Sequence, residues 1–225
     1  MATKFLTFNQ DLNEAVDLKE WVKEEAVPDE HLPLRYVWHV WEQVQQEDRS
    51  KEYSDNTRDL ASFDTVQKFW QLWSYIPQPS ELLDHKRMVR QDKNGRSHVV
   101  DALMIFKEGI KPMWEDPRNA TGGHFEYRLA YPQTSAGQID EYWNNLVLGL
   151  IGSTVEGSDH ITGIRLVDKL SQGRHSCIRI EVWYSKLPSR DAQDALLKEV
   201  NKCMASKIDG SIGTIPRADV KNHGK

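Results

Sequence analysis

The sequence of 225 residues has only two cysteines, Cys177 and Cys203, and no long run of apolar residues. Two cysteines cannot build a disulfide framework, and they favour a reducing compartment. A membrane-spanning helix needs about 20 consecutive apolar residues. The sequence has no such stretch, and no signal-peptide pattern near its start. We therefore expect a soluble intracellular protein, located in the cytoplasm and not associated with membranes.

An excess of positive charge is also missing. Asp and Glu outnumber Lys and Arg by 34 to 29, which gives a formal net charge of −5. Broad, sequence-independent binding to nucleic acid needs a basic surface, so this composition argues against it. A smaller site that holds one or two phosphates with a few local cations stays open.

The common catalytic signatures are absent as well. The sequence contains no Gly-rich phosphate loop, no His-Glu-x-x-His pair, no nucleophile elbow and no Cys/His spacing suited to zinc. We therefore expect no metal, no cofactor and no catalytic residues. Glu115, Asp116 and His124 form the best remaining acid–base group, which keeps a hydrolase of nucleotide or capped substrates as an alternative. Without a metal or a nucleophile to serve, a binding loop with ordinary surface charges explains these residues better.

Tryptophan, in contrast, is abundant: eight Trp exceed seven Tyr and six Phe. Tryptophan is enriched where proteins bind flat or apolar partners. Trp114 stands beside Glu115 in a segment that Pro112, Pro117 and the pair Gly122-Gly123 predict to be a loop. A flat ring next to a carboxylate suits a nucleobase, which stacks on the ring while its N–H groups donate to the carboxylate. The alternative, that Trp114 covers the core and Glu115 is solvated, stays open from these residues alone.

The length suits one domain with tails. Residues 1–30 are rich in charge and predict a flexible arm with a helix over 11–27, and residues 206–225 predict a disordered tail. The domain between them, 31–205, contains predicted strands at 34–41, 99–106, 124–131, 161–170 and 177–186, the third being the return of the second. It also contains predicted helices at 65–76, 138–151 and 188–204. This alternation indicates an α+β fold, an antiparallel sheet with helices packed on one face.

Two of these helices have more apolar surface than a core requires. In the helix at 65–76 the apolar side chains cover an arc of about 220°, against roughly 100° for a core-facing stripe. In the helix at 138–151, Leu148 alone lies on the polar side. A wide apolar arc and a stray Leu together predict a groove for a protein partner.

Three basic residues, Lys169, Arg174 and Arg179, fall on or beside the hairpin at 161–186. Their side chains would converge on phosphate groups if they pointed to the same face. A solvated sheet edge explains the same pattern, so the residues alone leave both interpretations open.

Several motifs occur in one order along the chain. Residues 63–70 read FDTVQKFW and residues 106–116 read FKEGIKPMWED. Leu34, Trp38 and Trp41 lie on the first predicted strand, and 150–152 reads LIG. Together these segments resemble the eukaryotic translation initiation factor 4E family, the messenger-RNA cap-binding proteins, over residues 32–188. The motif FKxGIxPMWED of that family is matched almost residue for residue.

The resemblance implies a curved antiparallel β-sheet with three long helices packed on its convex face and a cap slot on its concave face. It implies that N7-methylguanine is sandwiched between Trp114 and a second ring, at the position of Tyr53. Glu115 matches the acceptor for the guanine N1 and N2 donors, and Trp183 matches the residue against the N7-methyl group. The positive charge of the methylated ring strengthens such stacking by about 0.5–2 kcal/mol.

For the cap phosphates the resemblance implies Arg179 first, then Arg174, with Lys169 and His124. The sequence departs from the family here, because Tyr53 stands in place of Trp, His124 in place of Arg, and the basic hairpin is longer. We therefore expect a lowered affinity or an unusual cap preference.

On the convex side, the resemblance assigns partner binding to Pro33, Val66, Trp70 and Leu148, which match positions that dock a helical Tyr-x-x-x-x-Leu-apolar motif. Asn145 replaces an acidic residue that supports this motif, so we expect an altered partner sequence. The implied partners are capped mRNA and a scaffold initiation factor of the 4G type or a 4E-binding repressor, with the chain a monomer within a heteromeric complex. A translational repressor or storage factor, and a scaffold that has lost cap binding, remain as alternatives.

Overall fold

The computed structural model describes residues 4–7, 31–45, 56–84, 86–91, 94–171 and 176–224. The described strands are β1 (Lys4–Thr7), β2 (Pro33–Val44), β3 (Thr57–Thr65), β4 (Lys86–Gln91), β5 (Ser97–Lys107), β6 (Gly123–Leu129), β7 (Ile161–Asp168), β8 (Ile178–Tyr184) and β9 (Ala218–Asn222). The described α-helices are α2 (Val66–Trp73), α3 (Ala136–Ile151) and α4 (Arg190–Ala205), with 3₁₀ turns at Pro79–Asp84 and Ser158–His160. Among these helices none is long and apolar enough to span a membrane.

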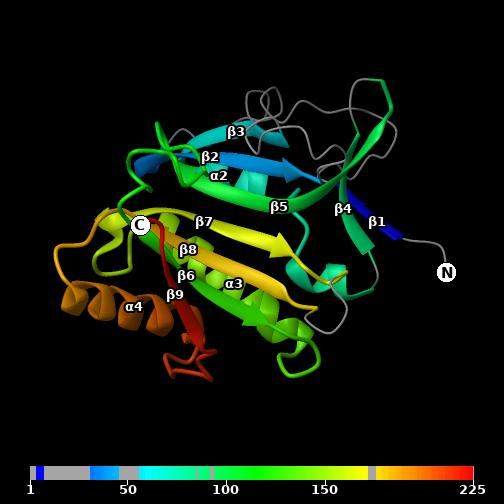
Figure 1. Cartoon of the computed structure of the whole chain (residues 1–225). Coiled ribbons are helices and arrows are strands. Elements are labelled where there is room, and N and C mark those ends of the chain that lie inside the picture. Colours follow the sequence, from blue (N-terminus) through cyan, green and yellow to red (C-terminus); the bar gives the residue numbers. More distant parts are fainter. Residues whose placement is uncertain are drawn as a thin grey trace.

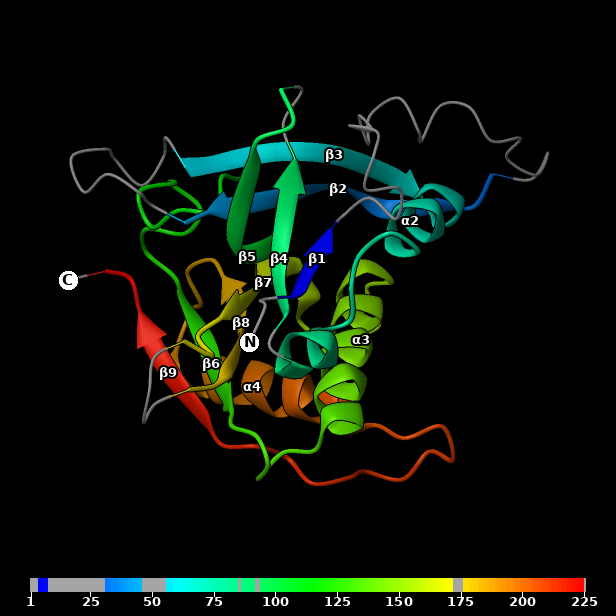
Figure 2. The ribbon, with the colours of Figure 1, turned by 90° about the vertical axis from the view of Figure 1, so that its right-hand side faces the viewer.

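All nine described strands belong to one curved sheet. Its main path runs β1-β4-β5-β7-β8-β6-β9, and β2 adds to β5 with β3 beyond it. The pairs are antiparallel except for β1 with β4. Figures 1 and 2 show α2 and α3 on the same side of the sheet, and α4 packs against α3. The predicted α+β class, a sheet with helices on one face, is confirmed.

Alternation along the central strands decides which side chains face the helices. On β8, Ile178, Ile180 and Val182 are buried in the main core, while Arg179, Glu181 and Trp183 point the other way. Strands β6 and β7 alternate in the same manner. Because neighbouring residues of a strand point to opposite faces, the apolar half of each strand packs toward the helices α3 and α4. The other half forms the surface that we call the helix-free face.

The main core lies between the sheet and α3. Trp143 of α3 is fully buried there, and its ring stacks with Trp73 of α2 at 6.1 Å between centroids. Burial of aromatic side chains of this size is a dominant stabilising term in small domains. This contact also fixes α2 beside α3, which places the exposed sides of the two helices on one surface.

Each helix begins at a side-chain cap. The hydroxyls of Thr65, Ser135 and Ser189 accept a hydrogen bond from the backbone three residues on, at α2, α3 and α4 respectively. Capping of this kind satisfies an amide that has no partner within the helix. The helices predicted at 65–76, 138–151 and 188–204 are therefore found, but the last begins after Ser189 and α2 ends at Trp73.

Several predictions about strands are wrong in detail. β3 and β4 were not expected, because their sequences TRDLASFDT and KRMVRQ are polar and lack a clean alternation. β6 is also not the return of β5, since β7 and β8 lie between them in the sheet. The Trp114 loop therefore crosses from one side of the β7–β8 hairpin to the other. The hairpin itself was predicted correctly.

Both expected tails contribute strands. The prediction of a flexible arm over residues 1–30 is wrong for Lys4–Thr7, which pair with β4. The prediction of a disordered tail over 206–225 is wrong for Ala218–Asn222, which pair with β6. The predicted helix at 11–27 lies outside the described residues. A short edge strand has little hydrophobic signal of its own, because its stability comes from hydrogen bonds to a neighbour far away in sequence.

Gly163 on β7 allows a test of this packing. A Cβ atom at this position would overlap the ring of the fully buried Phe106 on β5. We expect Gly163→Ala to lower the free energy of unfolding by about 1–3 kcal/mol, since an overpacked core must shift. Urea unfolding followed by tryptophan fluorescence measures this change.

Gly137 provides the matched control. It lies in the first turn of α3, and a Cβ atom there meets nothing within 4 Å. Gly137→Ala should leave the stability unchanged or slightly raised, because alanine loses less backbone entropy in a helix than glycine. Equal midpoints for the two variants would contradict the packing described for Phe106.

Candidate functional site

The loop that carries Trp114 is held by two buried polar side chains. The Asp116 carboxylate accepts hydrogen bonds from the backbone N–H groups of Lys111 at 2.8 Å and Arg118 at 2.9 Å. The Asn119 side-chain amide donates to the carbonyls of Lys111 at 2.9 Å and Met113 at 3.0 Å. These bonds satisfy the loop's backbone internally, as a buried polar group requires. The loop therefore has a defined shape without belonging to a helix or strand.

This bracing projects Trp114 and Glu115 outward. The Trp114 side chain is 61% exposed, which is unusual for an indole, and Glu115 is exposed beside it. The alternative that Trp114 covers the core is therefore wrong. Asn119 was not expected to have a role. Its complete burial and its hydrogen bonds show that it acts inside the loop.

Trp183 lies on the helix-free face, and it is fully buried. Its indole N–H donates to the Glu181 carboxylate at 2.9 Å, which fixes the orientation of the ring. The His124 ring of β6 stacks on it with centroids 5.4 Å apart and an interplanar angle of 13°. The ring of His223, just after β9, lies 4.5 Å from Trp183 and 6.2 Å from Trp114. The structure thus gathers both predicted tryptophans around a histidine that sequence reasoning missed.

An ionic network occupies the centre of the helix-free face. Glu181 binds Arg165 at 2.9 Å and Arg179 at 2.9 Å, and Glu126 binds Arg179 at 3.1 Å and Arg128 at 2.7 Å. The two carboxylates are almost completely buried. Buried charges are tolerated when they are paired and hydrogen-bonded, as they are here. Three guanidinium groups against two carboxylates leave the network with one net positive charge.

Burial and charge act against each other on the titratable groups of this face. Burial would raise the pKa of Glu181, but the guanidinium groups of Arg165 and Arg179 outweigh it and hold the pKa below its ordinary value. Burial lowers the pKa of His124 to about 4 and also lowers the pKa of His223. At neutral pH both histidines are therefore uncharged, and the net positive charge of the ionic network comes from arginine.

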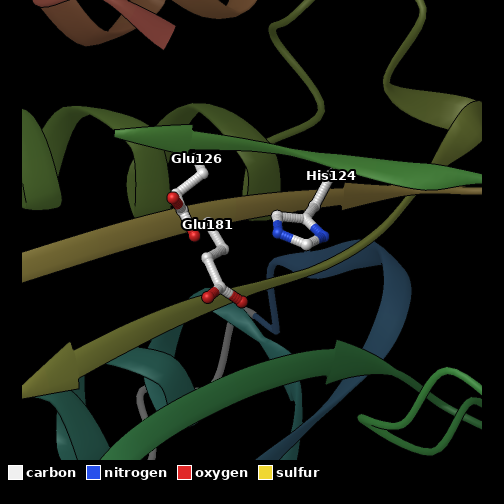
Figure 3. A group of neighbouring side chains, drawn as sticks. All are labelled: His124, Glu126 and Glu181. Atoms are coloured by element: carbon white, nitrogen blue, oxygen red, sulfur yellow. The ribbon is translucent and has the colours of Figure 1, made fainter. Parts of the chain in front are cut away.

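His124, Glu126 and Glu181 also lie close enough to be considered as metal ligands (Figure 3). One potential ligand atom from each lies within 4.8 Å of the others. However, each carboxylate already binds two guanidinium groups, and a cation placed among them would have to displace those partners. The arrangement favours the ionic network over a divalent metal.

The geometry also disfavours the hydrolase alternative. Asp116 is used in bracing the loop, and His124 Nδ1 lies 2.7 Å from Nε2 of His223. Glu115 is exposed on the loop and is not part of the one group of possible metal ligands found among the described residues. The three side chains thus have separate roles and form no acid–base group.

The structure places the predicted phosphate-binding residues in different environments. Arg179 is on the helix-free face but is shared between two carboxylates, and Lys169 follows β7 with its side chain half-buried. Arg174 and the predicted base-stacking residue Tyr53 lie outside the described residues.

Lys221 of β9 was missed, because it falls in the segment that was expected to be disordered. It pairs in register with His124, and register partners point to the same face, so Lys221 adds an exposed cation there.

On the other side of the molecule, most of the residues predicted to bind a partner are exposed. Trp70 of α2 is 50% exposed and Leu148 of α3 is 39% exposed. Pro33 is exposed and pairs in register with Thr65, next to the half-buried Val66. The apolar side chains of α2 and α3 that the core does not require are thus exposed to solvent.

Asn145 has a structural contact that its sequence position did not predict. Its side-chain amide donates to the carbonyls of Met204 at 3.0 Å and Ser206 at 2.8 Å. These bonds tie α3 to the end of α4 and satisfy carbonyls that have no partner within the helix. Beside it, Leu148, Gly149 and residues of α4 line a groove of about 420 Å³.

Comparison with known proteins relates this architecture to one family. The model of the family "Eukaryotic initiation factor 4E" matches residues 33–213. The chain is 36% identical over 143 residues to eukaryotic translation initiation factor 4E1 of Drosophila melanogaster, a match that covers 62% of this chain and 48% of that protein. It is 30% identical over 201 residues to eukaryotic translation initiation factor 4E of Aplysia californica, covering 87% of this chain and 79% of that one.

Solved structures agree in fold. The Ascaris suum eIF4E-3 structure, in complex with an m2,2,7G cap, has a TM-score of 0.61 and 25% identity, and the match covers 85% of this chain and 98% of that one. C. elegans eIF4E-3, in complex with the 4E-binding protein Mextli, has a TM-score of 0.61 and 24% identity, covering 84% and 93% of the two chains. Since the family model spans strands β2 to β8 and helices α2, α3 and α4, this chain belongs to the eukaryotic initiation factor 4E family.

Proposed function

We propose that this chain binds the N7-methylguanosine 5′ cap of messenger RNA and recruits a translation initiation scaffold through α2 and α3. The observation that carries the proposal is the braced loop, which presents Trp114 and Glu115 side by side and exposed. A solved relative of the same family is described with a methylated guanosine cap, which supports the assignment. As a member of this family the chain is a binding protein and not an enzyme.

The base would be recognised by stacking on aromatic rings and by hydrogen bonds from the donors on its edge. Trp114 offers one indole face, and the sequence spacing assigns the second ring to Tyr53. Glu115 accepts from the guanine N1 and N2 donors, and Trp183 contacts the N7-methyl group. Methylation gives the base a positive charge, so electron-rich rings discriminate it from plain guanine. Bonds from base donors to a carboxylate are charge-assisted and thus strong.

The phosphates would be bound by the positive charge of the helix-free face. We assign Arg179 first, with Arg174, Lys169 and His124 beside it. Arg179 would share its guanidinium with Glu126 and Glu181, and His124 is neutral where the family carries a permanent cation. These features support the expectation of a weakened affinity or an unusual cap preference.

The partner would bind the exposed sides of α2 and α3. Pro33, Val66, Trp70 and Leu148 fit a helical Tyr-x-x-x-x-Leu-apolar motif, such as that of a 4G-type scaffold or a 4E-binding repressor. An amphipathic helix in a shallow apolar groove is an established recognition mode. Asn145 is neutral and its amide is already bonded to the end of α4, so it does not replace the acidic residue that supports this motif. The complex would form in the cytoplasm, where messages are translated.

Replacement of Trp114 tests the base slot. Trp114→Ala should weaken binding of N7-methyl-GTP by about tenfold or more, because base–aromatic stacking contributes about 1–3 kcal/mol. The preference for N7-methyl-GTP over GTP should shrink as well, since the cation–π contribution is lost. Isothermal titration calorimetry with both nucleotides measures the two effects. Trp70→Ala, which removes a similarly exposed indole from α2, is the matched control and should bind as the unmodified chain does.

Replacement of Glu115 gives a different signature. Glu115→Gln keeps the size of the side chain but removes its charge, so the affinity should fall by about tenfold for a lost charge-assisted bond. The donors at guanine N1 and N2 are present with or without the methyl group. Both nucleotides should therefore lose the same factor in affinity, and the ratio of their two affinities should stay unchanged. A selective loss for the methylated nucleotide alone would contradict the role assigned to Glu115.

The partner surface is tested separately. Trp70→Ala should weaken binding of a synthetic helical Tyr-x-x-x-x-Leu-apolar peptide by at least about tenfold, because buried tryptophans are typical interface hot spots. Fluorescence anisotropy of the labelled peptide measures this affinity. Trp114→Ala should leave it unchanged. If both variants bind the peptide as well as the unmodified chain, the partner lies elsewhere.

A further inference from the structure

The segment after β9 enters the helix-free face at the predicted base slot. β9 pairs along the edge of β6, as Figures 1 and 2 show, and this pairing continues to His223, whose backbone N–H donates to Gly122 at 3.0 Å. The ring of His223 is half-buried, although it lies only two positions before the last residue of the sequence.

Hydrogen bonds fix this ring on both of its nitrogens. Nδ1 of His223 lies 3.0 Å from the carbonyl oxygen of Asn119, and a carbonyl can only accept, so Nδ1 carries the proton. Nε2 then accepts from Nδ1 of His124 at 2.7 Å. Asn119 belongs to the braced loop and His124 to β6. The ring is therefore tied at once to the loop that carries Trp114 and to the floor of the face.

The ring of His223 also lies against Trp183 and Trp114, which the proposed function assigns to the base, and against His124, which it assigns to the phosphates. Its centroid lies 4.5 Å from Trp183, 5.0 Å from His124 and 6.2 Å from Trp114, the last at an interplanar angle of 28°. A base stacked on each side needs about 3.5 Å to either ring, or roughly 7 Å in all. The space between Trp114 and His223 is too small for that.

The consequence is clearest at Trp183. The rings in contact with Trp183 belong to Phe106, His124 and His223, and its side chain has no exposed surface. Phe106 is fully buried in β5, and His124 lies within β6 between two neighbouring strands. His223 is different, because it lies beyond the end of its strand. It is the ring among these three that can leave without unpairing a central strand.

Resting on the proposed function, we propose that His223 is an autoinhibitory residue that fills the cap slot and must be displaced before the N7-methyl group reaches Trp183. The cap and the segment at 218–223 then compete for one site. The observed affinity is the intrinsic affinity multiplied by the fraction of molecules in which the slot is open. The segment thus sets how tightly the chain binds capped messages.

His223→Ala tests this competition directly. Removing the ring should tighten binding of N7-methyl-GTP by about tenfold, since the loss of its side-chain contacts raises the fraction of open slots. Isothermal titration calorimetry on the full chain measures the change. Val220→Ala is the matched control, because Val220 lies on strand β9, is 40% exposed and pairs in register with Phe125, which places it on the opposite face from His124. It should bind as the unmodified chain does.

A second measurement needs no substitution. Hydrogen exchange of the unmodified chain should show faster exchange of the amides of 220–223 when N7-methyl-GTP is added, because the ligand displaces the segment. A chain that ends at Asn222 should behave like His223→Ala, which guards against a folding defect in one variant.

The outcomes separate the inference from the function on which it rests. If the unmodified chain prefers N7-methyl-GTP over GTP, but His223→Ala binds it equally or less tightly, the autoinhibitory role is wrong and the ring is a ligand contact or a bystander. Slower exchange of 220–223 with ligand would overturn it too. If no variant distinguishes the methylated nucleotide from GTP, the proposed cap binding fails, and the inference fails with it.

Discussion

The packing of the sheet's apolar face against α3 is the constraint on which the rest of the structure depends. Trp143 anchors this face, and the alternating side chains of β6, β7 and β8 follow from it. A slip of one residue in any of these strands would exchange the two faces. The core therefore determines the register, and the register places Trp183, Glu181 and His124 on the helix-free face.

The helix-free face is an ionic surface and not a row of free cations. Glu126 and Glu181 are almost fully buried, and each is neutralised by two guanidinium groups. Charges removed from water must be paired, so the arginines are committed to the fold before any ligand arrives. A phosphate chain would meet a small net positive charge held by a rigid network. Such a site discriminates between phosphate groups by the geometry of their hydrogen bonds more than it attracts negative charge in general.

The features that could be predicted from the sequence are those whose signal lies in a short, continuous segment. The Trp114 loop, the β7–β8 hairpin and the helices have local signals: proline and glycine punctuation, alternation, and a 3.6-residue period. β3, β4 and β9 lack such signals, since they are polar and gain stability from distant neighbours. For the proposed site, Trp114, Glu115 and Trp183 were predicted from motifs. His223 and Lys221 were not, because only pairing with β6 brings them to the slot.

The sequence by itself determined the family, the adjacent pair of Trp114 and Glu115 on a loop, and the apolar sides of α2 and α3. These depend on contiguous residues whose chemistry and spacing are visible without coordinates. Only the tertiary structure decided the order of strands, the pairing of Arg179 with two carboxylates, and the contact of His223 with Trp183. Each of these joins segments far apart in the chain, where the geometry of the folded sheet and not sequence spacing sets which groups meet.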